Sequence, residues 1–239
     1  RLTFSRSKSE FCLQGKPGST TYITYIEQAS LLVRKVSIAP SIMANHIKKL
    51  ETSNAIYPIR RVVVKYMTIK EKTTSEVLDN IYVGKMPRRV VVGFVKHTAA
   101  SGSFTENPFH FQPFGLEKIN LIVAGHNIPF RKDMEFNFDK KHCIRGYNSL
   151  FKGVNRSLYE TGNDISLDDY VDGYTLFAFN LSPDLCDGDH WSVPKTGDLK
   201  LDVKFKTELT SNISAIFYLE FDNTIEITNY RQVLFDYKV

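Results

Sequence analysis

Residues 186–191 (Cys-Asp-Gly-Asp-His-Trp) hold the densest group of side chains that could bind a metal ion. Carboxylate, imidazole and thiolate groups all ligate metals, which makes Asp187, Asp189 and His190 candidate ligands. A tetrahedral site built from such close neighbours needs strain or distant partners, and no second cluster has a matching spacing. The alternative, which we favour, is a polar loop that Trp191 anchors and whose aspartates accept backbone hydrogen bonds.

Other catalytic patterns are missing from the sequence. The six histidines are scattered, and none forms a His-x-His pair or lies near a glutamate as in a metal-dependent sandwich enzyme. No Gly-x-Ser-x-Gly segment offers a serine nucleophile. The paired carboxylates Asp168 and Asp169 fall at an expected helix start, where the helix dipole explains negative charge. The residues themselves therefore give no evident active site and do not support a metal-dependent enzyme.

Basic pairs recur along the chain, whose formal net charge is +5. No aromatic residues alternate with them in the manner of a single-strand binding platform. We interpret them as solvated strand ends, and weak contact with DNA is the alternative. The pairs are Arg34-Lys35, Lys48-Lys49, Arg60-Arg61, Arg88-Arg89 and Lys140-Lys141.

Composition favours strands as the elements that would position these side chains. The chain has 239 residues, of which 42% are hydrophobic and 13% aromatic, enough for one large core. No apolar run approaches the ~20 residues that span a bilayer. The three cysteines are odd in number and far apart, which favours reduced thiols in an intracellular compartment.

The stretch 199–237 has the clearest pattern. Apolar and charged residues alternate over 199–206 and again over 213–227, and 232–237 returns as a third run. Period two predicts strands with one buried and one wet face, and we expect the three to form an antiparallel meander. Its charged face is a candidate contact surface and comprises Lys200, Lys204, Lys206, Glu220 and Glu226.

Further strands and short helices precede this stretch. The apolar stripe of Met43, Ile47 and Leu50 predicts a helix that begins at Pro40, and 143–158 and the turn after Ser166 also have helical signals. In the loop 99–114, we expect phenylalanines to plug the core. Strands are expected at 1–13, 22–26, 30–38, 59–69, 77–83, 89–95, 119–123, 128–130 and 173–181.

These elements predict an all-β fold. Irregular spacing, long loops and the lack of βαβ alternation favour an antiparallel two-sheet jelly-roll sandwich with one or two short helices in the connections. An immunoglobulin sandwich fits less well, because the chain is long and lacks the Cys-Trp-Cys pattern.

An ordered set of motifs resembles the major capsid protein of Polinton (Maverick) elements and adintoviruses. The motifs are Tyr-Pro-Ile-Arg-Arg-Val (57–62), Pro-Arg-Arg-Val-Val-Val-Gly-Phe-Val (87–95), Asn-Pro-Phe-His-Phe (107–111), Gly-Tyr-Thr-Leu-Phe-Ala-Phe-Asn-Leu-Ser-Pro-Asp-Leu (173–185), His-Trp (190–191), Glu-Phe-Asp-Asn (220–223) and Val-Leu-Phe-Asp-Tyr (233–237). They run in order over nearly the whole chain.

The resemblance implies a double jelly-roll structural protein whose homotrimeric capsomers tile an icosahedral shell. It implies a protein that is not an enzyme and needs no cofactor. It implies localisation in the virion, assembly inside the host cell, no secretion and no membrane partner. Since the chain is too short for two jelly rolls, we expect 1–38 to be the last strands of a preceding roll, or linking strands, and 39–239 to be the C-terminal roll. The alternative is a non-enzymatic jelly-roll module that binds carbohydrate or a receptor.

Structural and assembly roles are expected mainly for aromatic residues of the motifs. Loops 99–114 and 130–172 are the expected inter-subunit and outer surfaces. The residues concerned are Pro108, Phe109, Phe111, Tyr174, Phe177, Trp191 and Phe221.

Overall fold

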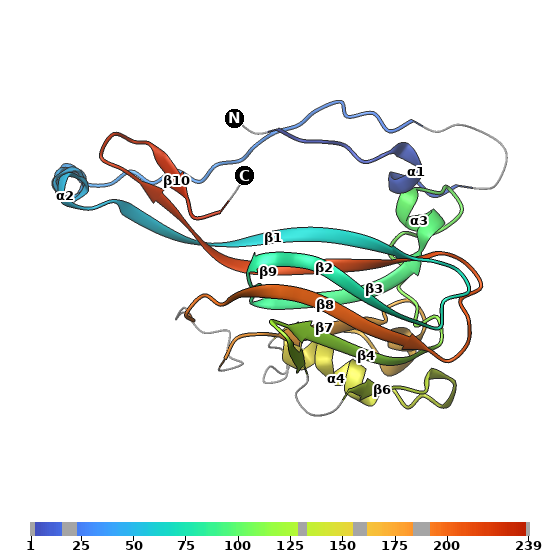
Figure 1. Cartoon of the computed structure of the whole chain (residues 1–239). Coiled ribbons are helices and arrows are strands. Elements are labelled where there is room, and N and C mark those ends of the chain that lie inside the picture. The colour runs from blue at the N-terminus through green and yellow to red at the C-terminus, as the bar shows by residue number, and fades with distance from the viewer. Residues whose placement is uncertain (1–2, 16–22, 129–132, 155–161, 184–191, 238–239) are drawn as a thin grey trace. The chain divides into compact units, whose positions relative to one another are not determined.

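The computed structural model describes residues 3–15, 23–128, 133–154, 162–183 and 192–237 (Figure 1). The strands are β1 (Ala55–Ile69), β2 (Ser75–Lys85), β3 (Arg89–Lys96), β4 (Leu116–Val123), β5 (His126–Ile128), β6 (Met134–Glu135), β7 (Leu176–Asn180), β8 (Thr196–Phe205), β9 (Ile213–Ile227) and β10 (Val233–Phe235). The helices are α1 (Ser9–Cys12), α2 (Pro40–Thr52), α3 (His97–Ser101), α4 (Ile144–Gly153) and α5 (Leu167–Val171), with a 3-10 turn η1 (Phe138–Lys140).

The strands form two five-stranded sheets. Sheet A has the order β1-β9-β3-β7, with β10 on β9, and sheet B has the order β2-β8-β4-β5, with β6 on β4. Neighbours pair antiparallel, as β3 does with both β7 and β9 and β8 does with both β2 and β4. Figure 1 shows β2 and β8 in one layer and β9 and β3 in another.

The strand order is that of a jelly roll. Setting aside the short strands β6 and β10, the chain crosses between the sheets at every step except β4 to β5, and each sheet receives four strands. Strands from the C-terminal half insert between strands from the N-terminal half in both sheets. This double Greek-key connectivity confirms the predicted all-β jelly-roll sandwich.

The core lies between the inner faces of the two sheets. Phe94 of β3 packs edge-on against Phe205 of β8, with ring centroids 6.2 Å apart. Alternate residues of β8 are buried from Leu199 to Phe205, so its period-two pattern corresponds to one face in the core, whereas β3 is buried on both faces over most of its length. The inner-face residues of β8 and β9 include Leu199, Leu201, Val203, Phe205, Phe217, Leu219 and Phe221, each at most 1% exposed.

The predicted meander of 199–206, 213–227 and 232–237 is wrong in its pairing. β9 and β10 form an antiparallel hairpin as expected, but β8 belongs to sheet B and β9 to sheet A. The connection 206–212 is a crossover between sheets, not a hairpin turn. Both strands have one apolar face, and these faces meet across the sandwich. The alternating pattern does not predict this, because an apolar face can be buried whether the two strands lie in one sheet or in two facing sheets.

Two compact units divide the chain: 1–24 with 62–220, and 25–61 with 221–239. In the second unit α2 begins at Pro40, as predicted, and none of its residues is buried. The predicted strands at 22–26 and 30–38 are not found among residues 23–38, which form no regular element. A strand needs a neighbour for its backbone groups, and the described chain pairs none with this segment.

The N-terminal residues also differ from expectation. Instead of a strand over 1–13, the described part contains the short helix α1. In the first unit Gly15 N donates to Phe104 O over 2.7 Å, so this segment is tied to the loop after α3. Figure 1 shows α1 beside α3.

Helix α4 covers the edge strand β7. Ser149 Oγ of the helix accepts a hydrogen bond from Ala178 N, and a Cβ at Gly153 would lie 2.4 Å from Ala178 Cβ. The helix therefore approaches the strand closely only because residue 153 lacks a side chain. A covered edge cannot pair with another chain. Ser166 caps α5 through the predicted capping box with Asp169.

Candidate assembly surfaces

The motif residues Arg89 and Glu220 form a buried ion pair. They face each other in the β3–β9 register, and Arg89 Nη1 lies 2.9 Å from Glu220 Oε2. Arg89 Nε donates to Gly153 O over 2.6 Å, which satisfies a carbonyl at the end of α4. The two residues are 9% and 5% exposed. The Arg89 guanidinium group therefore links β3, β9 and α4.

This pair corrects two expectations. Arg89 was expected to be a solvated strand end, and Glu220 was placed on a charged face. Both side chains do lie on the outer face of sheet A, since their neighbours Val90 and Leu219 point into the core. They are nevertheless buried because the end of α4 reaches this part of the face. Period-two patterning cannot reveal a helix that covers the second face of a sheet.

Backbone hydrogen bonds link the motifs at 107–111 and 173–185. Phe111 N donates to Gly173 O over 2.9 Å, and Thr175 N donates to Phe111 O over 3.1 Å. A Cβ at Gly93 would lie 2.6 Å from atoms of both Phe111 and Leu176. The missing side chain of Gly93 therefore leaves the space on the outer face that the side chains of Phe111 and Leu176 occupy.

In the second unit, Arg61 makes cation–π contacts and hydrogen bonds with residues near the C-terminus. The Arg61 guanidinium lies 4.8 Å from the Phe221 ring centroid and 4.7 Å from that of Tyr237. Arg61 Nε donates to Asn223 Oδ1, and Asn223 Nδ2 donates to Asp236 Oδ1. Cation–π contacts of this kind contribute about 0.5–2 kcal/mol each. Residues of the motifs at 57–62, 220–223 and 233–237 are therefore in contact with one another.

The predicted structural and assembly residues fall into three groups. Phe177 and Phe221 are buried in the core. Pro108, Phe109 and Phe111 line a groove, and Tyr174 is half exposed. Phe109 is 63% exposed, so the expected phenylalanine plug is wrong for this residue; its ring lies edge-on to Phe11, outside the core. Trp191 and the candidate ligands Asp187, Asp189 and His190 lie outside the described residues.

Metal-ligating side chains do not gather elsewhere in the described ranges, where no group of three His, Cys, Asp or Glu could hold an ion. Cys12 is exposed and Cys143 is buried, and neither forms a disulfide. Burial raises the pKa of the Cys143 thiol above its ordinary value, which leaves the thiol protonated and unreactive at neutral pH. In the described parts, no helix combines the length and apolarity needed to cross a membrane.

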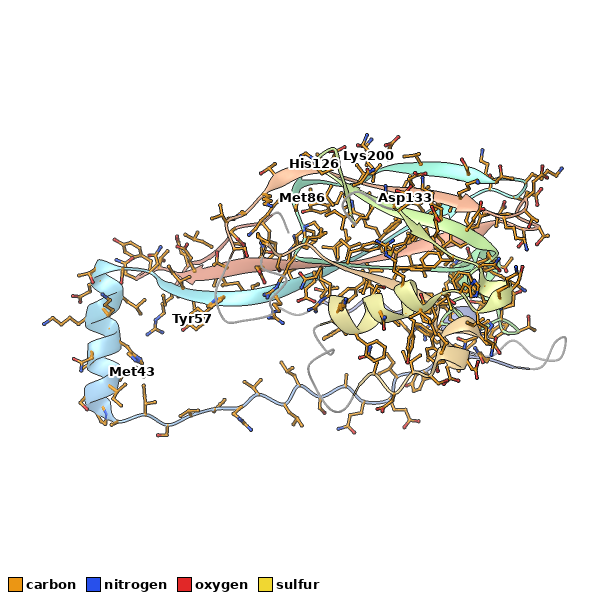
Figure 2. All side chains as sticks on the ribbon, turned by 90° about the horizontal axis from the view of Figure 1, so that it is seen from below. Met43, Tyr57, Met86, His126, Asp133 and Lys200 are labelled. Carbon is orange, nitrogen blue, oxygen red and sulfur yellow. The ribbon has the colours of Figure 1, made fainter. Side chains whose placement is uncertain are left out.

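The outer face of sheet B carries a ladder of ion pairs. Lys118 Nζ lies 2.8 Å from Asp133 and 3.4 Å from Asp202, and the hydrogen bond to Asp133 raises the pKa of Lys118. Lys200 Nζ lies 3.1 Å from Asp79, and Figure 2 shows Lys200 and Asp133 among the side chains of this part. Local charge balance makes this face a poor binder of polyanions.

The chain from residue 23 to residue 66 exposes many large apolar side chains. Residues 23–38, the helix α2 and the outward positions of β1 all contribute. Leu32 is 94% exposed, Met43 projects from α2 (Figure 2), and Tyr66 is 73% exposed. The full set is Ile23, Tyr25, Ile26, Leu31, Leu32, Val33, Val36, Ile38, Ile42, Met43, Ile47, Ile56, Tyr57, Val62, Val64 and Tyr66. We call 23–38 the apolar arm.

Comparisons with known proteins give distant similarities. No family model matches the chain. It is 25% identical over 247 residues to the uncharacterised protein F54H12.2 of Caenorhabditis elegans, covering 99% of this chain and 57% of that protein. The chain therefore spans somewhat over half the length of this curated relative.

The solved structures that are similar come from viral capsids. PBCV-1 VP54, fitted into a reconstruction of the Sputnik virophage, has a TM-score of 0.48 at 10% identity, over 80% of this chain and 54% of that chain. The Sputnik virophage structure has a TM-score of 0.46 at 12% identity, over 78% and 39%. The mavirus major capsid protein has a TM-score of 0.38 at 12% identity, over 77% and 41%. The jelly-roll assignment itself rests on the strand order.

Proposed function

We propose that this chain is part of a major capsid protein, a structural protein without enzymatic activity that builds a viral shell. Residues 39–239 form its C-terminal jelly roll, and the finer assignment is to the Polinton (Maverick) and adintovirus type. The ordered motifs and the jelly-roll strand order agree with this function. Because one fold serves many functions, the proposal needs an observation about surfaces as well.

The exposure of apolar side chains over 23–66 carries the proposal. Free-standing soluble proteins rarely expose such extensive apolar surface, which marks places where other protein packs. A subunit of a shell needs surface of this kind, and a catalytic protein does not. A separate carbohydrate-binding module would leave the apolar arm without a partner.

The apolar arm is further proposed to belong to a preceding jelly roll. Residues 30–38 have strand-forming composition, yet the described chain provides no strand beside them. A second jelly roll would offer the missing hydrogen-bond partners. In this arrangement 1–38 completes the preceding roll, and α2 leads into the C-terminal one.

The proposed assembly is a homotrimeric capsomer that contacts neighbouring capsomers in a virion. Residues 25–61 carry six lysines and arginines against two glutamates, so this basic stretch is the place where weak contact with packaged DNA is proposed. The ion-pair ladder of sheet B, with its balanced charges, has no such role.

Light scattering tests the assembly. We expect self-association of the 239-residue chain to rise with concentration, and the mass of the protein extended upstream to approach that of a trimer. Association should survive moderate salt, because apolar burial drives it. A chain that stays monomeric at high concentration in both forms would refute the capsid proposal and favour the carbohydrate- or receptor-binding module.

A further inference from the structure

A groove on the outer face of sheet A has the composition of a small-molecule site. Its volume is about 550 Å³, and all its lining residues belong to the first unit. Val64 and Tyr66 of β1 and Ile216 of β9 line it from the sheet, while Phe11 and Phe109 contribute aromatic rings. Ligand pockets in proteins have volumes of about 300–1,000 Å³ and mostly apolar walls.

A small polar cluster lies in this apolar lining. His97 Nδ1 lies 3.0 Å from Ser214 Oγ, and His97 Nε2 lies 3.4 Å from Ser101 Oγ. Ser214 is fully buried, so its position is fixed by the sheet and by the imidazole. A few converging hydrogen-bonding groups in an apolar pocket are what orients a ligand.

The charge of the lining selects the kind of ligand. Lys8 is its one residue with a formal charge at neutral pH, and no carboxylate from the described chain lines the groove. Lys8 is exposed, so it offers an anionic group an attraction that is real but partly screened by water. The apolar rings would meanwhile cover a hydrocarbon chain.

We propose that this groove binds an anionic amphiphile, a carboxylic acid with a hydrocarbon tail. The tail lies along Val64, Ile216 and Phe109, and the carboxylate is near Lys8 and the His97 hydroxyl cluster. This explains why Phe109 and Tyr66 leave most of their rings exposed: bound hydrocarbon is their missing contact. Val64 and Tyr66 also belong to the exposed apolar stretch that supports the shell proposal, whereas the other lining residues of the groove lie outside that stretch.

Displacement of the fluorescent fatty acid cis-parinaric acid tests the proposal on the 239-residue chain, with decanoate as the competitor and decanol as its neutral match. Ile216→Trp should weaken decanoate binding at least about tenfold by filling the groove, a loss equal to about 1.4 kcal/mol. Ala100→Phe fills the groove from α3 and guards against misfolding of the first variant. Val83→Trp, on the exposed part of β2, is the matched control and should bind normally.

The variant Lys8→Met tests whether the carboxylate of the ligand contributes to binding. Decanoate affinity should fall about two- to fivefold, as expected for an exposed charge, while decanol affinity stays constant. Decanol binding as tightly as decanoate would overturn the assignment of an anionic ligand. Unchanged decanoate binding in both filled variants, or binding only to anionic phospholipid vesicles, would overturn the site itself.

Discussion

At the scale of single residues, burial separates structural charges from surface charges. Arg89 and Glu220 are in contact with each other and with the end of α4, and hardly any water reaches them. Lys200 and Asp79 are also 3.1 Å apart, but they lie on the wet face of sheet B. Exposed pairs contribute about 0–1 kcal/mol, whereas loss of one partner of a buried pair strands a charge away from water.

Arg89→Met should therefore lower the free energy of unfolding by about 3–5 kcal/mol, because Glu220 is left charged under α4. Denaturant unfolding measures this change. The double variant Arg89→Met with Glu220→Leu should recover most of the loss, since both charges of the buried pair are then replaced by apolar side chains.

The matched control is Lys200→Met, which breaks an exposed pair of similar length. We expect it to leave the free energy of unfolding close to that of the unchanged protein, because water already screens this pair. Equal losses in Arg89→Met and Lys200→Met would show that the Arg89 site is hydrated and that α4 does not seal it.

At the scale of elements, α4 and β7 show how one absent side chain sets a distance. A glycine at the end of a helix interior costs about 1 kcal/mol relative to alanine, so propensity alone favours Gly153→Ala. The structure opposes it, because the added Cβ would also lie 2.8 Å from the backbone of Ala178. The backbone of Ala178 cannot avoid this contact by a change of rotamer, as a flexible side chain can.

Gly153→Ala should accordingly destabilise the protein, by about 1–3 kcal/mol as for overpacked cores. Thermal melting checks this, with Lys152→Ala as the control in the neighbouring position of the helix, where the side chain is exposed. A rise in the melting temperature of Gly153→Ala would mean that propensity outweighs the contact and that α4 sits farther from β7.

Sequence patterning predicted elements whose signal is local. The helix from Pro40, the helical turn after Ser166 and the strand at 89–95 were all confirmed. Strand pairing was predicted less well. The runs 199–206 and 213–227 each have an apolar face that must be covered, but neither pattern indicates whether the two strands pair in one sheet or lie in opposite sheets. The arm 23–38 was expected in strands for the same local reason.

Candidate sites were harder to predict because they depend on contacts between distant residues. The sequence identified Phe109 by its type, but the structure places its ring outside the core, against Phe11. The groove at His97 was missed, since Ser101 and Ser214 meet this histidine only after α3 and β9 are folded together. Its one local signal was the His97–Ser101 spacing on a short helix.

At the scale of the whole molecule, the ion-pair ladder and the densest exposure of apolar side chains occupy different parts of the chain. Sheet B presents ion pairs, while the stretch 23–66 presents bare apolar side chains. If this stretch is an assembly surface, single charges introduced there should block association without unfolding either sheet.

Val33→Lys is the variant that tests this idea, because Val33 is 64% exposed in the apolar arm. We expect the associated fraction at a fixed concentration to fall at least about fivefold, a loss of about 1 kcal/mol, as burying an unpaired ammonium is unfavourable. Sedimentation velocity measures that fraction. Val83→Lys, at 66% exposure on β2, is the matched control and should associate normally. Association that both variants reduce equally would indicate a general charge effect.

The order of strands in the two sheets also governs when this protein can fold during its synthesis. In sheet A, β9 separates β1 from β3, and in sheet B, β8 separates β2 from β4. β1 and β2 therefore leave the ribosome before their neighbours, whereas β3 and β4 can already pair with β7 and β5. Completion of both sheets must wait for β8 and β9, and pairing between strands so far apart in the sequence slows folding.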